Sequence, residues 1–325
     1  MWEAAALLLL LLLLLPLSLV LLPRFRREAA LQPAGRAVLI TGCDSGFGQL
    51  LALRLHRLGF TVFAGCLCPG GEGARRLQRE AATCSGRLRV LQLDVTRERD
   101  VAAAKEVVLS NLPETGFWGL VNNAGISTFG ETGWLPMEKY EKFVNVNLLG
   151  CIRTTLAFLP LLRKYKGRVV FMSSTTAYFT LGNGIYSMTK AALEKFCDCL
   201  RLEMKKFGVL VCVIQPGNYS RSTNIQPPVN AEQIWNELNE EEKAVYNKEY
   251  VKRFSDFFNN ILKEGSTTAH EVVDVMVEAL ISPAPKARYM VAKLKEKLLV
   301  LICTIFPTVV MDSFLSYALS KVNLT

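Results

Sequence analysis

Apolar and polar residues follow two different patterns along residues 37–216. Short continuous apolar runs recur, and between them lie longer stretches in which apolar residues return every three or four positions. The first pattern is typical of strands buried on both faces of a sheet, and the second of helices that cover it. We expect strands at 37–41, 60–65, 88–93, 119–121, 169–172 and 209–214. We expect helices at 46–58, 101–109, 139–162 and 186–207.

This order of elements predicts an α/β protein with a doubly wound parallel sheet, the Rossmann fold. The folded domain is expected at residues 36–290, because the regions before and after it have a different composition. Residues 1–23 are uncharged over most of their length, and residues 24–35 form a basic linker. Residues 291–325 form a C-terminal hydrophobic segment.

The N-terminal apolar run predicts a membrane helix. Residues 4–22 are 19 positions without a charged side chain. At about 1.5 Å per residue, this run just crosses a hydrocarbon core of about 30 Å. The alternative is a cleaved signal peptide, but the basic residues Arg24, Arg26 and Arg27 follow the run and none precedes it. The positive-inside rule therefore predicts an uncleaved anchor with the rest of the chain on the cytosolic side.

A second apolar run, residues 298–310, is too short to cross a membrane and contains Pro307 near its end. Lys293, Lys295 and Lys297 precede it. A helix lying in the membrane interface fits this pattern, and a core or dimer helix fits it equally well.

The amino-acid composition excludes several classes of partner and site. The chain has 38 Lys+Arg and 29 Asp+Glu residues, a net charge of +9, but its basic residues are scattered and follow no nucleic-acid-binding motif. We therefore expect an anionic membrane surface rather than a nucleic acid as partner. The two histidines, His56 and His270, cannot build a multi-histidine metal site, so we predict no metal and place both on the surface. The nine cysteines include no C-x-x-C pair and are predicted to be reduced, mostly buried thiols.

A glycine-rich turn follows the first strand. Residues 41–48 have the spacing T-G-x-x-x-G-x-G, with a helix directly after them. Glycines let the backbone approach a pyrophosphate, whose charge the helix N-terminus stabilises; without a ligand the same residues would be only a tight turn. Residues 64–67, after the second strand, supply neither a carboxylate for a ribose diol nor an arginine for a 2′-phosphate. Because Asp44 would repel that phosphate, and Arg75 and Arg76 are expected to be solvated, NAD is favoured over NADP.

Tyr186 and Lys190 are four residues apart on the last expected helix, so they share one helix face. Alone, this spacing is typical of a solvated pair. A neighbouring ammonium favours phenolate and brings the pKa of a tyrosine within reach of acid–base catalysis near neutrality. Ser174 follows the strand 169–172 and precedes Tyr186 by 12 residues, where its hydroxyl is placed to bind a substrate oxygen.

Together these motifs resemble the short-chain dehydrogenase/reductase family over residues 36–216. In family order, the matching segments are the turn 41–48, 93–95, 122–125, Asn147, Ser174, Tyr186, Lys190, Pro216 and Gly217. Residues 42–48, 118–120 and 216–219 are similar to one branch. That branch contains retinol dehydrogenases, type 2 17β- and 11β-hydroxysteroid dehydrogenases and 3-hydroxybutyrate dehydrogenase.

The resemblance implies residue roles. Tyr186 would be the acid–base, Lys190 would lower its pKa and hold the nicotinamide ribose, Ser174 would orient the alcohol or carbonyl, and Asn147 would support a proton relay. Asp94 and Val95 would contact the adenine, and Asn123 the adjoining ribose. The remaining residues expected to bind the cofactor are Gly42, Ser45, Gly46, Phe47, Gly48, Pro216 and Gly217. One position departs from the family pattern: Ala177 replaces the glycine usual three residues after the serine, which predicts a reshaped loop.

Residues 219–265 leave the family pattern and carry apolar side chains near helical spacing. These are Trp235, Leu238, Tyr246, Tyr250, Phe254, Phe257, Phe258 and Ile261. We interpret them as a helical lid over the substrate, since ligand pockets are mostly apolar; a helix packed on the sheet edge or a second subunit is the alternative.

The sequence therefore predicts an NAD-dependent short-chain alcohol dehydrogenase that acts on the CH–OH group of a lipophilic alcohol, a retinol or a hydroxysteroid. We expect it at the endoplasmic reticulum membrane, and the family implies a homo-oligomer. The alternatives are 3-hydroxybutyrate dehydrogenase in a mitochondrial membrane, which residues 63–67 and 125–131 resemble, and a catalytically idle membrane scaffold.

Overall fold

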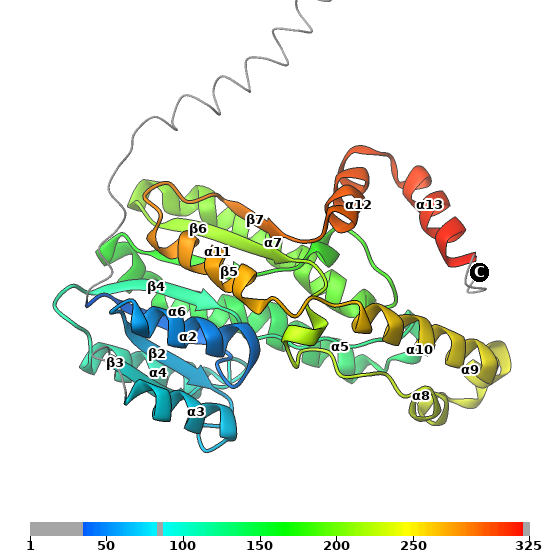
Figure 1. The fold of residues 1–325 in the computed structure, drawn as a ribbon, viewed down its shortest axis with the longest axis horizontal. Helices are drawn as coiled ribbons and strands as arrows, with labels where there is room; N and C mark the ends of the chain where they lie inside the picture. The colour runs from blue at the N-terminus through cyan, green and yellow to red at the C-terminus, as the bar shows by residue number, and fades with distance from the viewer. Residues whose placement is uncertain (1–34, 83–86, 321–325) are drawn as a thin grey trace, which may run out of the picture.

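The computed structural model describes residues 35–82 and 87–320. Seven parallel strands form one sheet in the order β3-β2-β1-β4-β5-β6-β7 (Figure 1). The strands are β1 Ala37–Thr41, β2 Thr61–Cys66, β3 Arg87–Gln92, β4 Phe117–Asn122, β5 Arg168–Met172, β6 Leu210–Pro216 and β7 Arg288–Val291. The chain reverses its direction of travel between β1 and β4, which is the switch point of a doubly wound sheet. The predicted fold class is confirmed.

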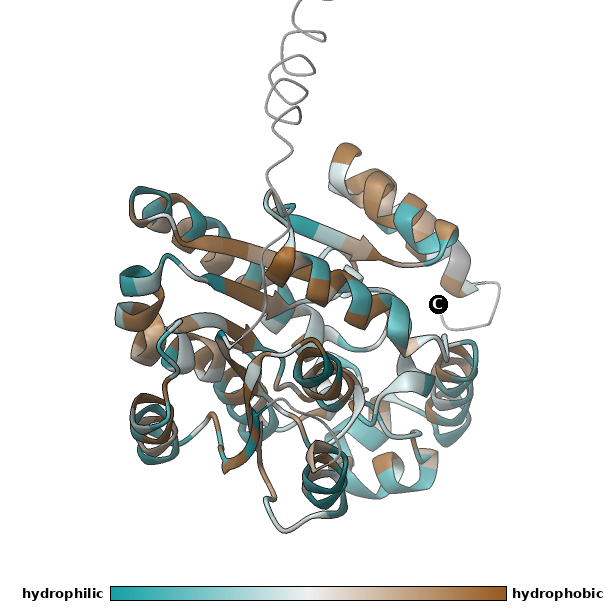
Figure 2. Cartoon of the chain, turned by 60° about the vertical axis from the view of Figure 1, so that its left-hand side comes forward, coloured by the Kyte–Doolittle hydropathy of each residue, from teal (hydrophilic) through white to brown (hydrophobic). Residues whose placement is uncertain are grey.

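Helices cover both faces of the sheet, and the central strands are predominantly apolar (Figure 2). The helices α2 (Gly46–Arg57), α3 (Glu72–Ala81) and α11 (Ala269–Ile281) contribute to one apolar cluster. The helices α4 (Glu98–Ser110), α6 (Gly150–Tyr165) and α7 (Gly184–Met204) contribute to the other. Because both faces are covered, the strands read as continuous apolar runs rather than as alternating ones.

The six expected strands are confirmed, each to within two residues of its observed bounds. The pattern missed α3, α11 and β7. The expected helix 139–162 is wrong as a single regular helix: α5 (Met137–Val144) and α6 are joined by a π-helical turn, Asn145–Leu149. Such a turn inserts one residue into the helical hydrogen-bonding pattern, which apolar spacing alone does not reveal.

His56 is also a correction, because it is buried and not on the surface. Its ring lies between α2 and α3, with Nε2 3.3 Å from the carbonyl oxygen of Ala81. The unforeseen helix α3 covers the face of α2 that was expected to meet solvent. His270, at the start of α11, is exposed as expected.

Among the described residues, one helix is long and apolar enough to cross a membrane. It is the continuous helical segment Met137–Tyr165. That segment packs on β4 and contributes Phe158 and Leu162, both fully buried, to the core, so it is a core helix. The membrane helix predicted at residues 1–23 and the linker at 24–35 fall almost wholly outside the described residues.

Five further helices follow β6. These are α8 Ala231–Glu237, α9 Glu240–Val245, α10 Lys248–Lys263, α12 Leu294–Ile305 and α13 Thr308–Ser320. The apolar run 298–310 is therefore not one segment, because α12 ends before Pro307 and α13 begins directly after it. In Figure 1, α12 and α13 stand beyond β7, apart from the helices that cover the sheet.

We expect Phe63→Ala to destabilise the domain by about 3–5 kcal/mol, because the ring of this β2 residue is fully buried and its removal leaves a cavity. The measurement is the free energy of unfolding in urea. Val245→Ala on α9 is the control, since Val245 is 75% exposed and its truncation should change stability by less than about 0.5 kcal/mol. Equal losses for the two variants would contradict the packing described here.

Candidate active site

A cavity of about 990 Å³ lies at the carboxyl ends of the central strands. Parallel strands bring all their carboxyl ends to one edge, where ligands bind in folds of this kind. The predicted site residues that line it are Gly42, Ser45, Gly46, Phe47, Asn123, Ser174, Tyr186, Lys190, Pro216 and Gly217. They come from segments up to 175 positions apart, and the fold brings them together as the motifs predicted.

The glycine-rich turn has the conformation that a pyrophosphate site needs. Gly42 and Gly46 have φ angles of +70° and +59°, which side chains rarely adopt. A Cβ on Gly48 would collide with the carbonyl oxygen of Gly42, so only glycine fits there. Within the described chain no side chain caps α2, which leaves the amides of its first turn for a ligand. The turn therefore fits a dinucleotide.

Asn123 ties this turn to β4. Its Nδ2 donates to the carbonyl oxygens of Thr41 and Gly42 at 2.9 and 3.0 Å. The Thr41 hydroxyl oxygen in turn accepts the backbone N–H groups of Asn123 and Ala124 at 3.0 and 2.9 Å. The two strands at the switch point are thus cross-linked by hydrogen bonds beneath the cofactor-binding turn.

Asp44 supplies the carboxylate that is missing from the end of β2. Its two oxygens accept the backbone N–H groups of Leu67 and Cys68, at 2.9 and 3.0 Å. These two residues directly follow β2, where a carboxylate that binds the adenosine ribose is usual. Asp44 therefore reaches from the glycine-rich turn to that position and lines the cavity there. The sequence shows the charge of Asp44 but not its position at the end of β2, because that position depends on how the turn and β2 pack together.

Tyr186 and Ser174 both line the cavity. Ser174 is buried, and its hydroxyl lies 3.4 Å from the carbonyl oxygen of Pro216. Burial raises the pKa of Tyr186 to about 12, and the hydrogen bond with Ser174 opposes that rise. At neutral pH the phenol of the protein without cofactor is therefore protonated and suited to donate a proton to a carbonyl oxygen.

The sequence predicts that Lys190 lowers the pKa of the Tyr186 phenol. The Lys190 ammonium lies 5.4 Å from the centre of the Tyr186 ring and donates to the carbonyl oxygen of Met172 at 2.8 Å. Burial lowers the pKa of Lys190 itself. The two groups share a helix face as predicted, but burial raises the pKa of the Tyr186 phenol, and the cause that opposes this rise is Ser174.

Four predicted residues lie outside the cavity lining: Gly48, Asp94, Val95 and Asn147. Asn147 is buried in the π-helical turn, where its side chain donates to and accepts from the backbone of Ile126, at 2.9 Å each, and donates to the Thr189 hydroxyl at 3.1 Å. The Asp94 carboxylate accepts from Thr96. Adenine binding by Asp94 and Val95 and a relay through Asn147 stay predictions.

Ala177 fits the loop after Ser174 without backbone strain. It ends a short 3₁₀ turn, Thr175–Ala177, and Lys166 is the one non-glycine residue with positive φ among those described. The glycine usual at this position is therefore not required by the backbone here. The same loop presents Phe179 to the cavity and Tyr178 to the protein interior.

The predicted lid is confirmed only in part. Phe258 and Ile261, near the end of α10, line the cavity. The other aromatic residues of the stripe instead pack on the loop that carries Phe129 and Trp134, with the ring centres of Phe129 and Phe254 4.9 Å apart. A helical repeat identifies a buried face, but it does not say whether a cavity or another apolar segment covers it.

The C-terminal helices close the cavity on a side that the sequence did not reveal. Leu298, Leu299 and Ile302 of α12 and Phe314 of α13 line it. The Glu296 carboxylate of α12 accepts the backbone N–H of Asn218 at 2.7 Å and lies against Gly217. The C-terminal segment is thus attached to the Pro216–Gly217 loop at the site itself.

The turn, the phenol–hydroxyl pair and the buried ammonium define a nicotinamide-dependent oxidoreductase, in which the dinucleotide accepts or supplies the hydride. The description of the family model that matches residues 36–234 is short chain dehydrogenase. The chain belongs to this family, and it is an alcohol dehydrogenase that uses NAD and acts on CH–OH groups.

Known relatives agree on the family and differ in substrate. The mitochondrial D-beta-hydroxybutyrate dehydrogenase of Rattus norvegicus is 44% identical over 79% of this chain and 76% of that protein. Short-chain dehydrogenase/reductase family 9C member 7 of Homo sapiens is 38% identical over 87% and 90%, and retinol dehydrogenase 7 of Mus musculus 37% over 91% and 92%. A short-chain dehydrogenase from Streptomyces avermitilis has the same fold, with a TM-score of 0.67 and 22% identity over 89% of this chain and 96% of that one.

We expect Asp44→Asn to raise the use of NADP relative to NAD by about tenfold or more, because it removes a negative charge that repels a 2′-phosphate. The measurement is the ratio of kcat/KM with the two cofactors. Glu106→Gln, the same charge change on the exposed face of α4, is the control and should leave the ratio unchanged. An unchanged ratio in both variants would mean that Asp44 does not select the cofactor.

Proposed function

We propose that this enzyme interconverts a lipophilic alcohol, a retinol or a hydroxysteroid, and its carbonyl compound. The observation that carries the proposal is the apolar wall of the cavity beyond the catalytic residues. It consists of Phe179, Leu181, Ile225, Phe258, Ile261, Leu262, Leu298, Leu299, Ile302 and Phe314. Such a wall stabilises an extended apolar substrate by removing it from water.

The positions of the cations argue against a small hydroxy acid. A carboxylate in this cavity needs a cation held for it. Apart from Lys190, the cations among the described lining residues are Lys293 and Lys295. Both are bound to Glu264: Lys293 donates to its carbonyl oxygen and Lys295 to its carboxylate, each at 2.7 Å. The hydroxybutyrate alternative rests on the relative of that name, and the lining favours the lipophilic substrate.

The catalytic step needs three side chains. In reduction, the neutral phenol of Tyr186 donates its proton to the carbonyl oxygen of the substrate. In oxidation, the phenolate left by loss of that proton accepts the proton of the alcohol. The Ser174 hydroxyl binds the same oxygen and holds it beside the phenol. The Lys190 ammonium, near the Tyr186 ring, stabilises the negative charge that the ring carries after proton loss.

The enzyme is placed at the cytosolic face of the endoplasmic reticulum membrane by its predicted N-terminal helix, with a mitochondrial membrane as the alternative. The helices α12 and α13, here called the C-terminal platform, support contact with lipid. Nine of the twenty exposed large apolar side chains among the described residues lie at positions 294–317, including Leu294 (83% exposed) and Val309 (70%). The exposed Lys297 and the two glutamate-bound lysines add a basic rim, as anionic headgroups require.

The platform also joins the membrane to the substrate site in this proposal. Leu298 and Phe314 line the cavity and are still 53% and 48% exposed. The cavity therefore opens among the apolar side chains of the platform. A substrate dissolved in the bilayer reaches Tyr186 by this route without crossing water. In Figure 2 the helix that leads to the C-terminus carries apolar residues although it stands at the edge of the molecule.

We also propose that two copies of the chain associate through the outer faces of α6 and α7. These faces expose Leu156, Met188 and Leu202, of which Leu202 is 73% exposed. Apolar side chains on neighbouring helices support a self-complementary contact between two copies.

We expect detergent-solubilised protein to form NADH with all-trans-retinol or estradiol and not with 3-hydroxybutyrate. Tyr186→Phe, which keeps the ring and removes the proton donor, should lower turnover by about a hundredfold or more. The measurement is NADH absorbance with the three substrates in parallel. Turnover of 3-hydroxybutyrate alone would overturn the substrate class, and equal turnover in the variant would overturn the role of Tyr186.

For the platform, we expect a phosphatidylcholine with a photoreactive acyl chain to label peptides of α12 and α13 in proteoliposomes of the full chain. Leu301→Asp with Val309→Asp should abolish this labelling and raise the KM for a lipid-dissolved alcohol, since a charge in the apolar interface is costly. The α9 peptide with Val245 is the control, because that side chain is 75% exposed but lies outside the platform. Equal labelling of both peptides would contradict lipid contact, and cross-links between two chains would indicate a second copy instead.

A further inference from the structure

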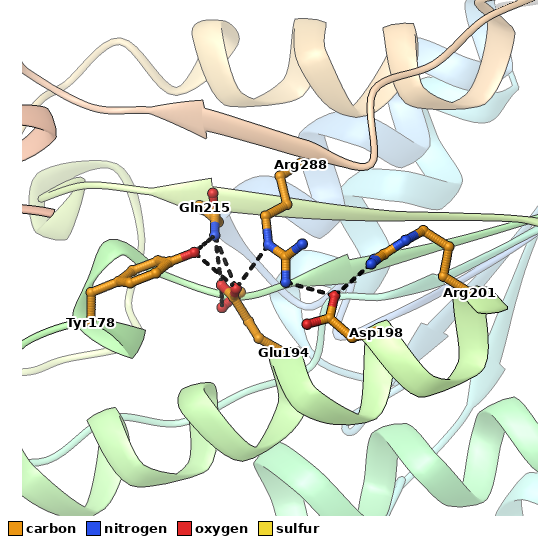
Figure 3. Close-up of polar contacts among 7 residues, drawn as sticks. Tyr178, Glu194, Asp198, Arg201, Gln215 and Arg288 are labelled. Atoms are coloured by element: carbon orange, nitrogen blue, oxygen red, sulfur yellow. Dashed lines mark hydrogen bonds and ion pairs between the residues drawn. The ribbon is translucent and has the colours of Figure 1, made fainter. Parts of the chain in front are cut away.

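One buried carboxylate outside the catalytic set contacts several elements of the active site. Glu194 lies on α7 and is 6% exposed. Its Oε1 accepts from the Ser173 hydroxyl at 2.7 Å and from Gln215 Nε2 at 2.8 Å. Its Oε2 accepts from Gln215 Nε2 at 3.0 Å, Arg288 Nε at 3.2 Å and the Tyr178 hydroxyl at 3.3 Å (Figure 3).

Two of these partners directly precede a residue of the site, and a third lies in the loop that follows Ser174. Ser173 directly precedes Ser174, and Gln215 directly precedes Pro216. Tyr178 follows the 3₁₀ turn after Ser174, and Glu194 itself is one helical turn beyond Lys190. A single side chain therefore connects α7 with the ends of β5 and β6 and with the loop between β5 and α7.

The charge of Glu194 is balanced from one side only. Arg288 of β7 is the cation that pairs with it, and this guanidinium also donates to Asp198 at 2.7 Å. A buried carboxylate is stable only when its oxygens are hydrogen-bonded and its charge is paired, as they are here. Loss of the charge would leave only one of the two oxygens as an acceptor, for which the donors from Ser173, Tyr178 and Gln215 would compete.

We propose that Glu194 is a positioning residue for the alcohol–carbonyl reaction, which holds Ser174, Lys190 and the Pro216–Gly217 loop at their places around the nicotinamide. This role does not depend on which alcohol is the substrate. It acts through the strand ends and not through contact with the substrate, since Glu194 lies outside the cavity lining.

Electrostatics adds a second route from Glu194 to the site. The groups that face Lys190 are the Met172 carbonyl of β5, Cys151 of α6, and Tyr186, Cys197 and Glu194 of α7. Burial lowers the pKa of Lys190, and Cys151, Cys197 and Glu194 oppose this fall. Without the charge of Glu194 the pKa of Lys190 falls further, so the ammonium is lost at a lower pH.

Asp198 provides a matched control. It lies one helical turn beyond Glu194 and accepts from Arg288 and Arg201, each at 2.7 Å (Figure 3). Neither partner adjoins Ser174 or Pro216 in the sequence. Asp198→Asn and Glu194→Gln thus both remove a carboxylate partner of Arg288, but only the second disconnects the strand ends.

The test compares Glu194→Gln and Asp198→Asn in the full chain in detergent. Three quantities are measured: NADH affinity by fluorescence titration, the pH profile of kcat for the best alcohol of the panel above, and the melting temperature. We expect Glu194→Gln to lower kcat and NADH affinity about tenfold or more and to move the alkaline fall of kcat to lower pH. Asp198→Asn should keep kcat and NADH affinity within about twofold while losing a similar amount of thermal stability.

Ser173→Ala keeps the test decisive if Glu194→Gln does not fold. It removes one hydroxyl and leaves the carboxylate paired with Arg288, so we expect lower kcat and an almost unchanged melting temperature. Equal kcat, NADH affinity and pH profiles for Glu194→Gln and Asp198→Asn would overturn the proposal, as would a Ser173→Ala variant with wild-type kinetics. NADH affinity needs no substrate, so it separates failure of this role from failure of the proposed substrate class.

Discussion

The burial of the five central strands of a parallel sheet on both faces is the constraint on which the rest of this structure depends. Parallel strands buried in this way need a crossover helix between each pair, and every crossover returns the chain to the same starting edge. All carboxyl ends therefore meet at one edge. The glycine-rich turn, Asn123 and Ser174 each follow a strand and Pro216 ends one, so the sheet alone brings them within one cavity.

Two carboxylates then fix the segments around the cavity at the carboxyl edge of this sheet. Asp44 extends from the glycine-rich turn and accepts the backbone N–H groups just after β2, so it adds a negative charge to the cavity lining there. Glu194 lies on the other side of the switch point and binds side chains from β5, β6 and β7. Glu194 is buried, and a buried carboxylate is stable only where several donors surround it, so its donors and their segments are held in place. Asp44 is only partly buried, and its two backbone hydrogen bonds fix the turn against the end of β2.

The helices outside the sheet form the part of the cavity wall that lies beyond the catalytic residues. The end of α10 and the two C-terminal helices make the apolar wall, and Glu296 attaches α12 to the loop that follows β6. The same helices expose apolar side chains on their outer surface. The C-terminal helices thus contribute both to the cavity wall and to an exposed apolar surface.

The sequence alone predicted six of the seven strands, the doubly wound parallel sheet and most of the residues that line the cavity as candidate cofactor and catalytic residues. It did so because these depend on local signals: a buried strand reads as an apolar run, and the turn 41–48 and the Tyr186–Lys190 pair have fixed spacing. Only the tertiary structure decided the rest. The role of Asp44, the burial of His56, the raised pKa of Tyr186 and the contacts of Glu194 all depend on which distant segments meet, and the spacing of residues along one segment carries no information about its neighbours. The aromatic stripe of residues 235–261 shows this limit most clearly: its helical period identified a buried face, but the tertiary structure placed most of it against Phe129 and Trp134 and left the cavity wall to α12 and α13.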